Sequence, residues 1–253
     1  MDPSEYRRIF EHEGDHFWYR ALHRLARREL ERFRPHSTGR VLDAGCGTGG
    51  FLAGAAAGLE IAGFGIDWSA LALGFARTRG LSRLARADVQ RLPFSTGSFD
   101  AVVSLDVLYH RAVADDAAAM AEFARVLVPG GIVVVNLPAH PELRGAHDEV
   151  IHTARRYARD GVIGLARSAG LDVVRVTGFN ALLYPVAVAV RRLRRGGPPR
   201  SDVEAVHPVV GGALSAVLAV ETGLNRWFDW PFGLSLFGVF RKPGSVAGPG
   251  GVG

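Results

Sequence analysis

The sequence predicts an α/β protein with a mostly parallel β-sheet and helices on both faces. Short apolar strands alternate with helical segments from residue 40 to residue 137, the pattern of parallel strands joined by helical crossovers. A glycine-rich turn follows the first strand at 45–50. The run IVVVNL (132–137) is apolar at nearly every position, which is typical of a strand buried on both faces.

The first element is an amphipathic helix over about residues 18–33. Its apolar side chains recur at spacings of three and four, arginines occupy the other face, and Pro35 and Gly39 end it. The alternation that follows predicts strands at 41–44, 61–66, 84–87 and 99–105, and helices at 51–59, after the N-cap Ser69, and at 115–128.

The second half continues the sheet and then departs from the simple alternation. Pro129, Gly130 and Gly131 are predicted to turn the chain into the strand 132–137. A helix at 157–169 and strands at 171–176 and 233–240 should complete the core. These elements divide the chain into an N-terminal helical cap (1–38), an α/β core (39–178), an insertion (179–232), a final core strand (233–243) and a disordered tail (244–253). The insertion carries two apolar helices around the linker 194–202 and is interpreted as a lid or an interface.

Composition excludes several classes of protein. A 253-residue chain with 48% hydrophobic residues is not disordered, and its single cysteine, Cys46, excludes an internal disulfide and a cysteine-based zinc site. The first residues lack the apolar segment of a secretory signal, so a cytoplasmic location is expected. The apolar stretches 181–190 and 209–220 are shorter than the roughly 20 residues that cross a bilayer, so no transmembrane helix is predicted.

The net charge of +5 arises from 30 basic and 25 acidic residues, and Lys242 is the only lysine. This arginine bias indicates a GC-rich genome, and nucleic acid is an unlikely partner because no aromatic residues interleave the basic run 191–195. That run either complements the dipole of a helix end or gives the segment 181–195 a weak contact with anionic lipid or an acidic substrate. The chain is expected to be a monomer or a homodimer.

The glycine turn at 45–50 predicts a nucleoside ligand at the top of the sheet. Glycines let the backbone approach a ligand, and Asp67 at the end of the second strand suits a ribose diol. The turn alone leaves a dinucleotide, S-adenosylmethionine and simple packing as alternatives. Cys46, inside the turn, is interpreted as a small spacer.

Three further features separate these alternatives. Asp43 precedes the glycines, where it would repel a pyrophosphate but can receive an ammonium group. Asp88 ends the third strand, where a carboxylate can accept from an adenine amino group. The segments SFDAVVSLDVLYH (98–110) and RVLVPGGIVVVNLP (125–138) then follow in order. Together these motifs resemble the small-molecule branch of the class I S-adenosylmethionine-dependent methyltransferases, strongly over about 40–140 and more loosely through HFWYR (16–20) and the closing strands.

The resemblance implies a Rossmann-like, seven-stranded sheet with an antiparallel last strand, S-adenosylmethionine as cofactor and S-adenosylhomocysteine as product. The cofactor would lie across the carboxyl ends of the strands. It implies these contacts: Asp43, Gly45, Gly47 and Gly49 with the methionine part, Asp67 with the ribose, Trp68, Asp88 and Val89 with the adenine, Ser104 and Leu105 near the transferable methyl, and Tyr19 with Trp18 as cover.

Candidate catalytic residues follow the fourth strand. His110 is the first candidate for a general base, with a capping or supporting histidine as the alternative. Asp106 either binds a substrate donor or caps the next turn. The predicted substrate wall comprises Tyr109, His147, Arg155, Arg156 and Tyr157. His140, His147, Asp148 and His152 invite a metal interpretation, but no HExxH pattern is present and no metal is predicted.

The sequence therefore predicts an S-adenosylmethionine-dependent methyltransferase that acts on an oxygen, nitrogen or carbon atom of a small, hydrophobic molecule. Two alternatives remain open: a non-methylating reaction assisted by the same cofactor, and a non-catalytic scaffold that binds it. An NAD-dependent dehydrogenase is disfavoured by Asp43 and by the context of Asp88.

Overall fold

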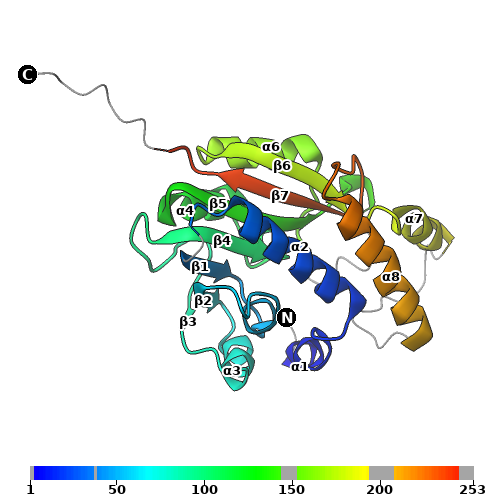
Figure 1. Ribbon diagram of the computed structural model, residues 1–253, viewed down its shortest axis with the longest axis horizontal. Helices are drawn as coiled ribbons and strands as arrows, with labels where there is room; N and C mark the ends of the chain where they lie inside the picture. Colours follow the sequence, from blue (N-terminus) through cyan, green and yellow to red (C-terminus); the bar gives the residue numbers. More distant parts are fainter. Residues whose placement is uncertain (1–2, 37–38, 144–152, 194–207, 245–253) are drawn as a thin grey trace, which may run out of the picture.

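The computed structural model describes residues 3–36, 39–143, 153–193 and 208–244. These residues form a seven-stranded sheet with the order β3-β2-β1-β4-β5-β7-β6 (Figure 1). Its strands are β1 (Gly39–Ala44), β2 (Ile61–Asp67), β3 (Leu84–Arg86), β4 (Phe99–Leu105), β5 (Leu127–Pro138), β6 (Asp172–Phe179) and β7 (Ser235–Arg241). The strands from β3 to β5 pair in parallel, and β7 is antiparallel to both of its neighbours. The predicted fold class is confirmed.

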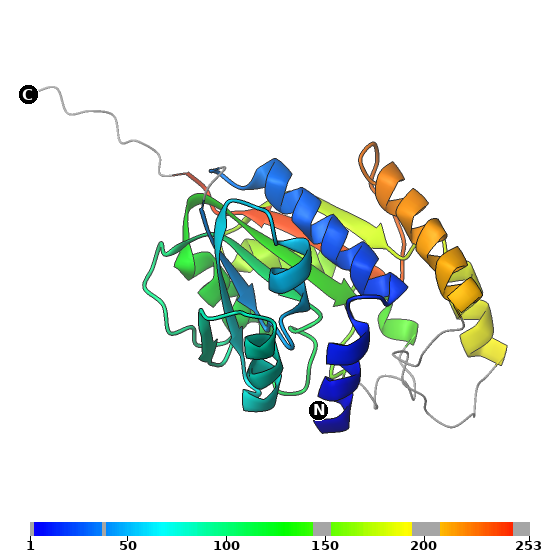
Figure 2. The ribbon, with the colours of Figure 1, turned by 60° about the horizontal axis from the view of Figure 1, so that its bottom comes forward.

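Helices cover both faces of the sheet, as Figures 1 and 2 show. The helices are α1 (Pro3–His12), α2 (Phe17–Phe33), α3 (Ala70–Thr78), α4 (Asp116–Val126), α6 (Arg159–Ser168), α7 (Tyr184–Leu193) and α8 (Pro208–Leu224), with short turns η1 (Phe51–Ala55) and η2 (Pro141–Leu143). Side chains of α4 and α6 pack on one face, and those of α2 and η1 pack on the other. Among the predicted helices of the insertion, α8 lies alongside α2.

The position of β5 inside the sheet explains the continuous apolar run in the sequence. Val133 and Val135 of β5 contribute to the core beneath α4 and α6, whereas Ile132 and Val134 contribute to the core beneath α2. All four side chains are fully buried. Because successive residues of a strand point to opposite faces, a strand covered on both sides is apolar at nearly every position.

Three predicted elements differ from the structure. The helix expected at 51–59 is only the short turn η1, and Gly58 adopts a left-handed conformation (φ +78°) that ends helical geometry. Residues 129–131 lie within β5 as an irregularity, since Phe99 pairs with Leu127 but Ala101 pairs with Ile132. The cap contains two helices, α1 and α2, where the sequence predicted one.

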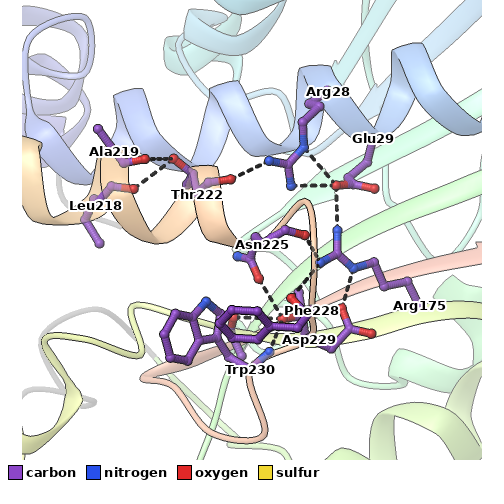
Figure 3. Close-up of polar contacts among 12 residues, drawn as sticks. Arg28, Glu29, Arg175, Leu218, Ala219, Thr222, Asn225, Phe228, Asp229 and Trp230 are labelled. Carbon is purple, nitrogen blue, oxygen red and sulfur yellow. Dashed lines mark hydrogen bonds and ion pairs between the residues drawn. The ribbon is translucent and has the colours of Figure 1, made fainter.

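The insertion is joined to the core by a buried cluster of charges (Figure 3). Glu29 of α2 is fully buried, and one of its carboxylate oxygens accepts hydrogen bonds from Arg28 and from Arg175 of β6, both at 2.8 Å. Arg175 also donates to Asp229 and to the backbone carbonyl of Asn225, which follow α8. The cluster therefore connects α2, the sheet and the end of the insertion.

The remaining domain assignments stay predictions. The linker 194–202 and residues 245–253 of the tail lie outside the described residues. Within the described part of the chain, every helix is too short or too polar to cross a membrane.

The buried cluster generates a stability prediction. Replacing Glu29→Ala removes the anion between Arg28 and Arg175 and leaves a buried guanidinium with one carboxylate partner fewer. We expect the free energy of unfolding to fall by about 3 kcal/mol, measured by denaturant unfolding. The matched control is Glu31→Ala, which removes an exposed carboxylate that pairs with Arg27 and should cost less than about 1 kcal/mol. Equal effects of the two changes would contradict the role given to the cluster.

Candidate functional site

The glycine turn begins where β1 ends and is held by the neighbouring strand. The backbone N–H groups of Gly45 and Cys46 donate to the carbonyl oxygen of Ile66 at 2.9 and 2.8 Å. Gly45, Gly47 and Gly49 all have left-handed φ angles, which side chains other than glycine rarely adopt. The turn is thus fixed by backbone geometry before any ligand is considered.

The three glycines differ in their surroundings. A Cβ atom at Gly45 would lie 2.3 Å from Val107, and one at Gly49 would lie 2.7 Å from Leu81, so these two positions allow close packing within the protein. A Cβ at Gly47 would meet nothing within 4 Å. Gly47 therefore presents bare backbone to open space, which suits the close approach of a ligand.

Asp67 ends β2 directly beside this turn. One carboxylate oxygen accepts the N–H of Gly47 at 2.9 Å, and the other accepts the N–H of Ser69 at 2.8 Å. Each oxygen keeps a further acceptor position, because a carboxylate offers about four. The side chain is therefore held in one orientation with capacity left for two hydroxyl donors.

Asp43 is buried at the end of β1, with 3% of its surface exposed. Burial, followed by the negative charges of Asp67 and Glu13, raises the pKa of Asp43 to about 8. Burial also raises the pKa of Asp67 and of Glu13. Three carboxylates around one glycine turn favour a cationic group and oppose a pyrophosphate.

Glu13 is a site residue that the sequence analysis missed. It follows α1, is buried, and accepts hydrogen bonds from the hydroxyl of Thr48 and from the guanidinium of Arg79 at 2.7 Å. A Cβ at Gly50 would lie 2.4 Å from its carboxyl carbon, so the fourth glycine of the turn makes room for this contact. The local sequence carries no signal for an ion pair that joins positions 13 and 79.

The predicted adenine contacts lie at the neighbouring edge. Asp88 follows β3, and its carboxylate accepts from the backbone and side-chain amides of Gln90 at 2.9 and 3.0 Å. Val89 is buried, whereas 62% of the Trp68 surface is exposed. The guanidinium of Arg86 lies 5.8 Å from the centre of the Trp68 ring. An open aromatic face next to Asp67 can receive a planar group.

Asp106 is an acid of the site that is held by both its backbone and its side chain. It follows β4 in a left-handed conformation (φ +60°) that is uncommon outside glycine, and its carboxylate accepts from the amide of Asn136 at 2.9 Å. Burial raises the pKa of Asp106 to about 7. Tyr19 of α2 lies near it, since burial and the charge of Asp106 raise the pKa of that hydroxyl. Asn136 is the single polar residue in the run 132–137, a signal that would have identified it.

Other predicted residues serve the scaffold. The hydroxyl of Ser104 is fully buried and donates to the carbonyl of Ala44 at 2.8 Å, which joins β4 to β1 next to Leu105. Trp18 packs against Phe179 with ring centres 6.1 Å apart. In His110, Nδ1 accepts the N–H of Ala112 at 3.1 Å, which agrees with the capping interpretation of this histidine.

The predicted substrate wall is partly assembled, and its polar groups hold loops together. Arg155 donates to the carbonyl of Val113 at 2.9 Å, and the hydroxyl of Tyr157 donates to Asp116 at 2.7 Å. Arg156 donates to the carbonyl of Ala139 at 3.0 Å, and the carbonyl of Tyr109 accepts from the N–H of Ala154 at 2.8 Å. His147, Asp148 and His152 lie outside the described residues. Within the described residues, no group of three candidate metal ligands occurs.

Comparison with known proteins identifies the family. Residues 42–135 match a family described as a methyltransferase domain. A demethylmenaquinone methyltransferase from Roseiflexus sp. is 38% identical over 204 residues, which cover 76% of this chain and 78% of the relative. The chain belongs to the class I S-adenosylmethionine-dependent methyltransferase family.

Other relatives differ from the chain in length. A 37.1 kDa protein in transposon TN4556 of Streptomyces fradiae is 32% identical over 75% of this chain and 56% of its own length. The O-methyltransferase cnsE of Penicillium expansum is 31% identical over 64% of this chain and 62% of its own length. The chain thus spans less than two thirds of each. The solved structure of the 4+2 cyclase SpnF has the same fold, with a TM-score of 0.60 and 24% sequence identity. The match covers 90% of this chain and 83% of the SpnF chain.

S-adenosylmethionine is the cofactor of this methyltransferase family, and the residues present fit it. The carboxylates around the glycine turn suit the ammonium group of its methionine part, and Gly47 leaves space for that part. The two oriented oxygens of Asp67 suit the paired hydroxyls of its ribose. The predicted contact of each residue stays a prediction; what the site offers is carboxylate acceptors and open space at Gly47.

The buried acid Asp43 generates a prediction on stability and pH. Its pKa lies near 8 when folded and at 3.8 as an ordinary carboxyl, so the folded chain holds a proton that the unfolded chain loses between pH 4 and 8. This acid therefore lowers stability progressively as the pH rises through that window. At pH 8 we expect Asp43→Asn to have a free energy of unfolding about 1–4 kcal/mol above that of the unchanged protein, and a higher thermal midpoint. At pH 4.5 the two proteins should differ little. A difference independent of pH would contradict the raised pKa.

Proposed function

We propose that the chain transfers a methyl group from S-adenosylmethionine to an oxygen, nitrogen or carbon atom of a small, hydrophobic molecule. The observation that carries this proposal is the meeting of the acid-lined glycine turn, Asp67 and Asp106 at one edge of the sheet. When bound, the cofactor supplies an electrophilic methyl group on a cationic sulfonium. The residues of the chain have to orient both molecules and handle the proton of the acceptor.

The cofactor would be held by groups from four strand ends. Asp43 would receive the ammonium group, with the backbone of Gly45, Gly47 and Gly49 beside it. Asp67 would accept hydrogen bonds from both ribose hydroxyls. Trp68, Asp88 and the backbone of Val89 would contact the adenine, and the backbone of Ser104 and Leu105 would face the reacting carbon, with Tyr19 as cover.

Asp106 is the general base that the geometry supports best. Its pKa of about 7 lets the carboxylate form near neutral pH and still take up a proton, which is the property required of a base. Asn136 fixes the carboxylate through a hydrogen bond of 2.9 Å. His110, the first candidate from the sequence, already accepts a backbone N–H through Nδ1 and would act as a loop cap.

A hydrophobic acceptor is supported by two features. Relatives of the chain are named as a demethylmenaquinone methyltransferase and an O-methyltransferase. The aromatic side chain of Tyr184, in the insertion, stacks on His140 just beyond β5, with ring centres 4.6 Å apart. Aromatic surface next to the carboxyl edge suits a ring-containing acceptor that carries few charges.

A non-methylating reaction is the second candidate, favoured by the likeness in fold to the cyclase SpnF. A methyltransferase forms one S-adenosylhomocysteine for each product molecule, whereas a cyclase or a scaffold leaves S-adenosylmethionine unchanged. Incubation with a panel of phenols, hydroxyquinones and amines, followed by mass spectrometry of both cofactor forms and of the acceptors, tests the proposal. If an acceptor were converted without formation of S-adenosylhomocysteine, methyl transfer would be rejected in favour of the non-methylating reaction.

The cofactor site generates an affinity prediction. Asp67→Ala removes a carboxylate proposed to bind two hydroxyls, so the Kd for S-adenosylhomocysteine should rise by the equivalent of about 1–3 kcal/mol in isothermal titration. Asp160→Ala, an exposed acid at the start of α6, serves as the control and should bind as the unchanged protein does. Unchanged affinity of the Asp67 variant would place the ribose elsewhere.

The assignment of the base generates a kinetic prediction. With an acceptor that loses a proton, Asp106→Asn should lower kcat about 10²-fold, with little change in the affinity for S-adenosylhomocysteine. In the unchanged protein kcat should rise with pH through about 7, because only the ionised carboxylate acts as a base, and this step should vanish in the variant. His110→Ala should have a smaller effect. A larger loss for His110→Ala than for Asp106→Asn would return the role of base to the histidine.

A further inference from the structure

The helix α8 is apolar on its exposed side as well as on its buried side. Glu221 is its single ionisable residue, and this carboxylate is buried and accepts the N–H of Leu182 at 3.0 Å. Val210, Val220 and Leu224 are exposed by 50, 57 and 38%. A helix with no charged face to present to water is normally covered by protein or lipid.

The apolar surface continues beyond the end of the helix. Trp227 is the most exposed large hydrophobic residue in the described part of the chain, at 85%, and Phe228 is exposed by 44%. The opposite side of α8 is fixed to the body of the protein, because Leu218, Thr222 and Asn225 are buried next to α2 (Figure 3). A partner that covers the exposed apolar side chains must therefore contact the side of α8 that faces away from α2.

Arginines border this surface. A groove of about 240 Å³ between α2 and α8 is lined by Arg24, Arg28 and Arg226 together with Leu25, Ala219, Thr222 and Gly223. Arg28 is occupied by Glu29 and by the carbonyl of Thr222 (Figure 3). Arg24 and Arg226 are exposed, and neither forms an ion pair with any described residue. Two exposed cations without an ion pair to any described residue thus lie next to an exposed apolar helix and an exposed tryptophan.

The geometry points to an anionic lipid surface as the occupant of this face. Lipid tails cover valine, leucine and phenylalanine side chains, tryptophan is favoured at the headgroup level, and acidic headgroups pair with arginine. Each arginine close to such a surface contributes about 1 kcal/mol of attraction, which corresponds to roughly fivefold in partitioning. A symmetric pair of chains would instead bring like charges together, because a two-fold interface places the same patch on both sides.

This face is distinct from the segment 181–195 for which the sequence predicted a weak membrane contact. It is formed by the exposed side of α8 with Trp227 and Phe228, and its cations come from α2 and from Arg226. The inference does not depend on the proposed methyl transfer, since lipid binding is measured without cofactor or acceptor.

Co-sedimentation of the full chain with lipid vesicles tests the inference. Vesicles of three parts phosphatidylcholine to one part phosphatidylglycerol should bind the chain, vesicles of phosphatidylcholine alone should bind it at least about tenfold more weakly, and added salt should release it. The double variant Arg24→Glu, Arg226→Glu should lose at least about tenfold in binding to the anionic vesicles. Arg167→Glu, a single charge reversal on α6 at the opposite face, is the control for Arg226→Glu alone: Arg226→Glu should weaken binding, and Arg167→Glu should bind as the unchanged protein does.

The apolar part is tested separately. Trp227→Ala and Val220→Glu should each weaken binding at unchanged thermal midpoints, because both side chains are exposed. A blue shift of tryptophan fluorescence on anionic vesicles should be present in the unchanged protein and absent in Trp227→Phe. The inference would be overturned if the chain did not sediment with anionic vesicles, or if the control and the double variant bound them equally. It would also be overturned if the chain did not bind vesicles but formed a concentration-dependent dimer that Val220→Glu dissociates.

Discussion

Parallel strands joined by crossovers end at the same edge of a sheet, and the site of this protein depends on that constraint. Asp43 lies in β1, Asp67 ends β2 and Asp106 follows β4, so residues more than 60 positions apart in the chain meet in space. The loops at this edge also hold one another. The first residues of the glycine turn donate to the end of β2, and Asp67 of β2 accepts from the middle of the turn. The shape of one loop is therefore determined by the strand beside it.

The same edge concentrates carboxyl groups in a poorly solvated region. Burial is the largest cause of the raised pKa of Glu13, Asp43, Asp67 and Asp106. Such groups lower the stability of the folded chain at neutral pH, since they either ionise without water or take up protons. Sites of this kind are retained where function requires them. A cationic ligand would relieve the repulsion, so the chemistry of the cofactor and the electrostatics of the free protein are complementary.

The helix α2 connects the site with the insertion. Near its first turn Tyr19 lies close to Asp106, and further along Glu29 joins Arg28 and Arg175 in the buried cluster. Arg175 in turn contacts Asp229, which follows α8. One helix thus positions both Tyr19 beside Asp106 and the apolar surface of α8. A displacement of α2 would alter both regions together.

The sequence by itself determined the strand and helix alternation, the glycine turn and the acids at the strand ends, because these features depend on local spacing. The antiparallel last strand was implied only by the resemblance of these motifs to a known family. Only the tertiary structure decided which polar groups are available for chemistry. Glu13 reaches the glycine turn from α1, Asp106 is oriented by Asn136 of the next strand, and Arg155 and Tyr157 are occupied by loop carbonyls and Asp116. These assignments depend on burial and on partners distant in the chain, and neither leaves a periodic signal in a single sequence.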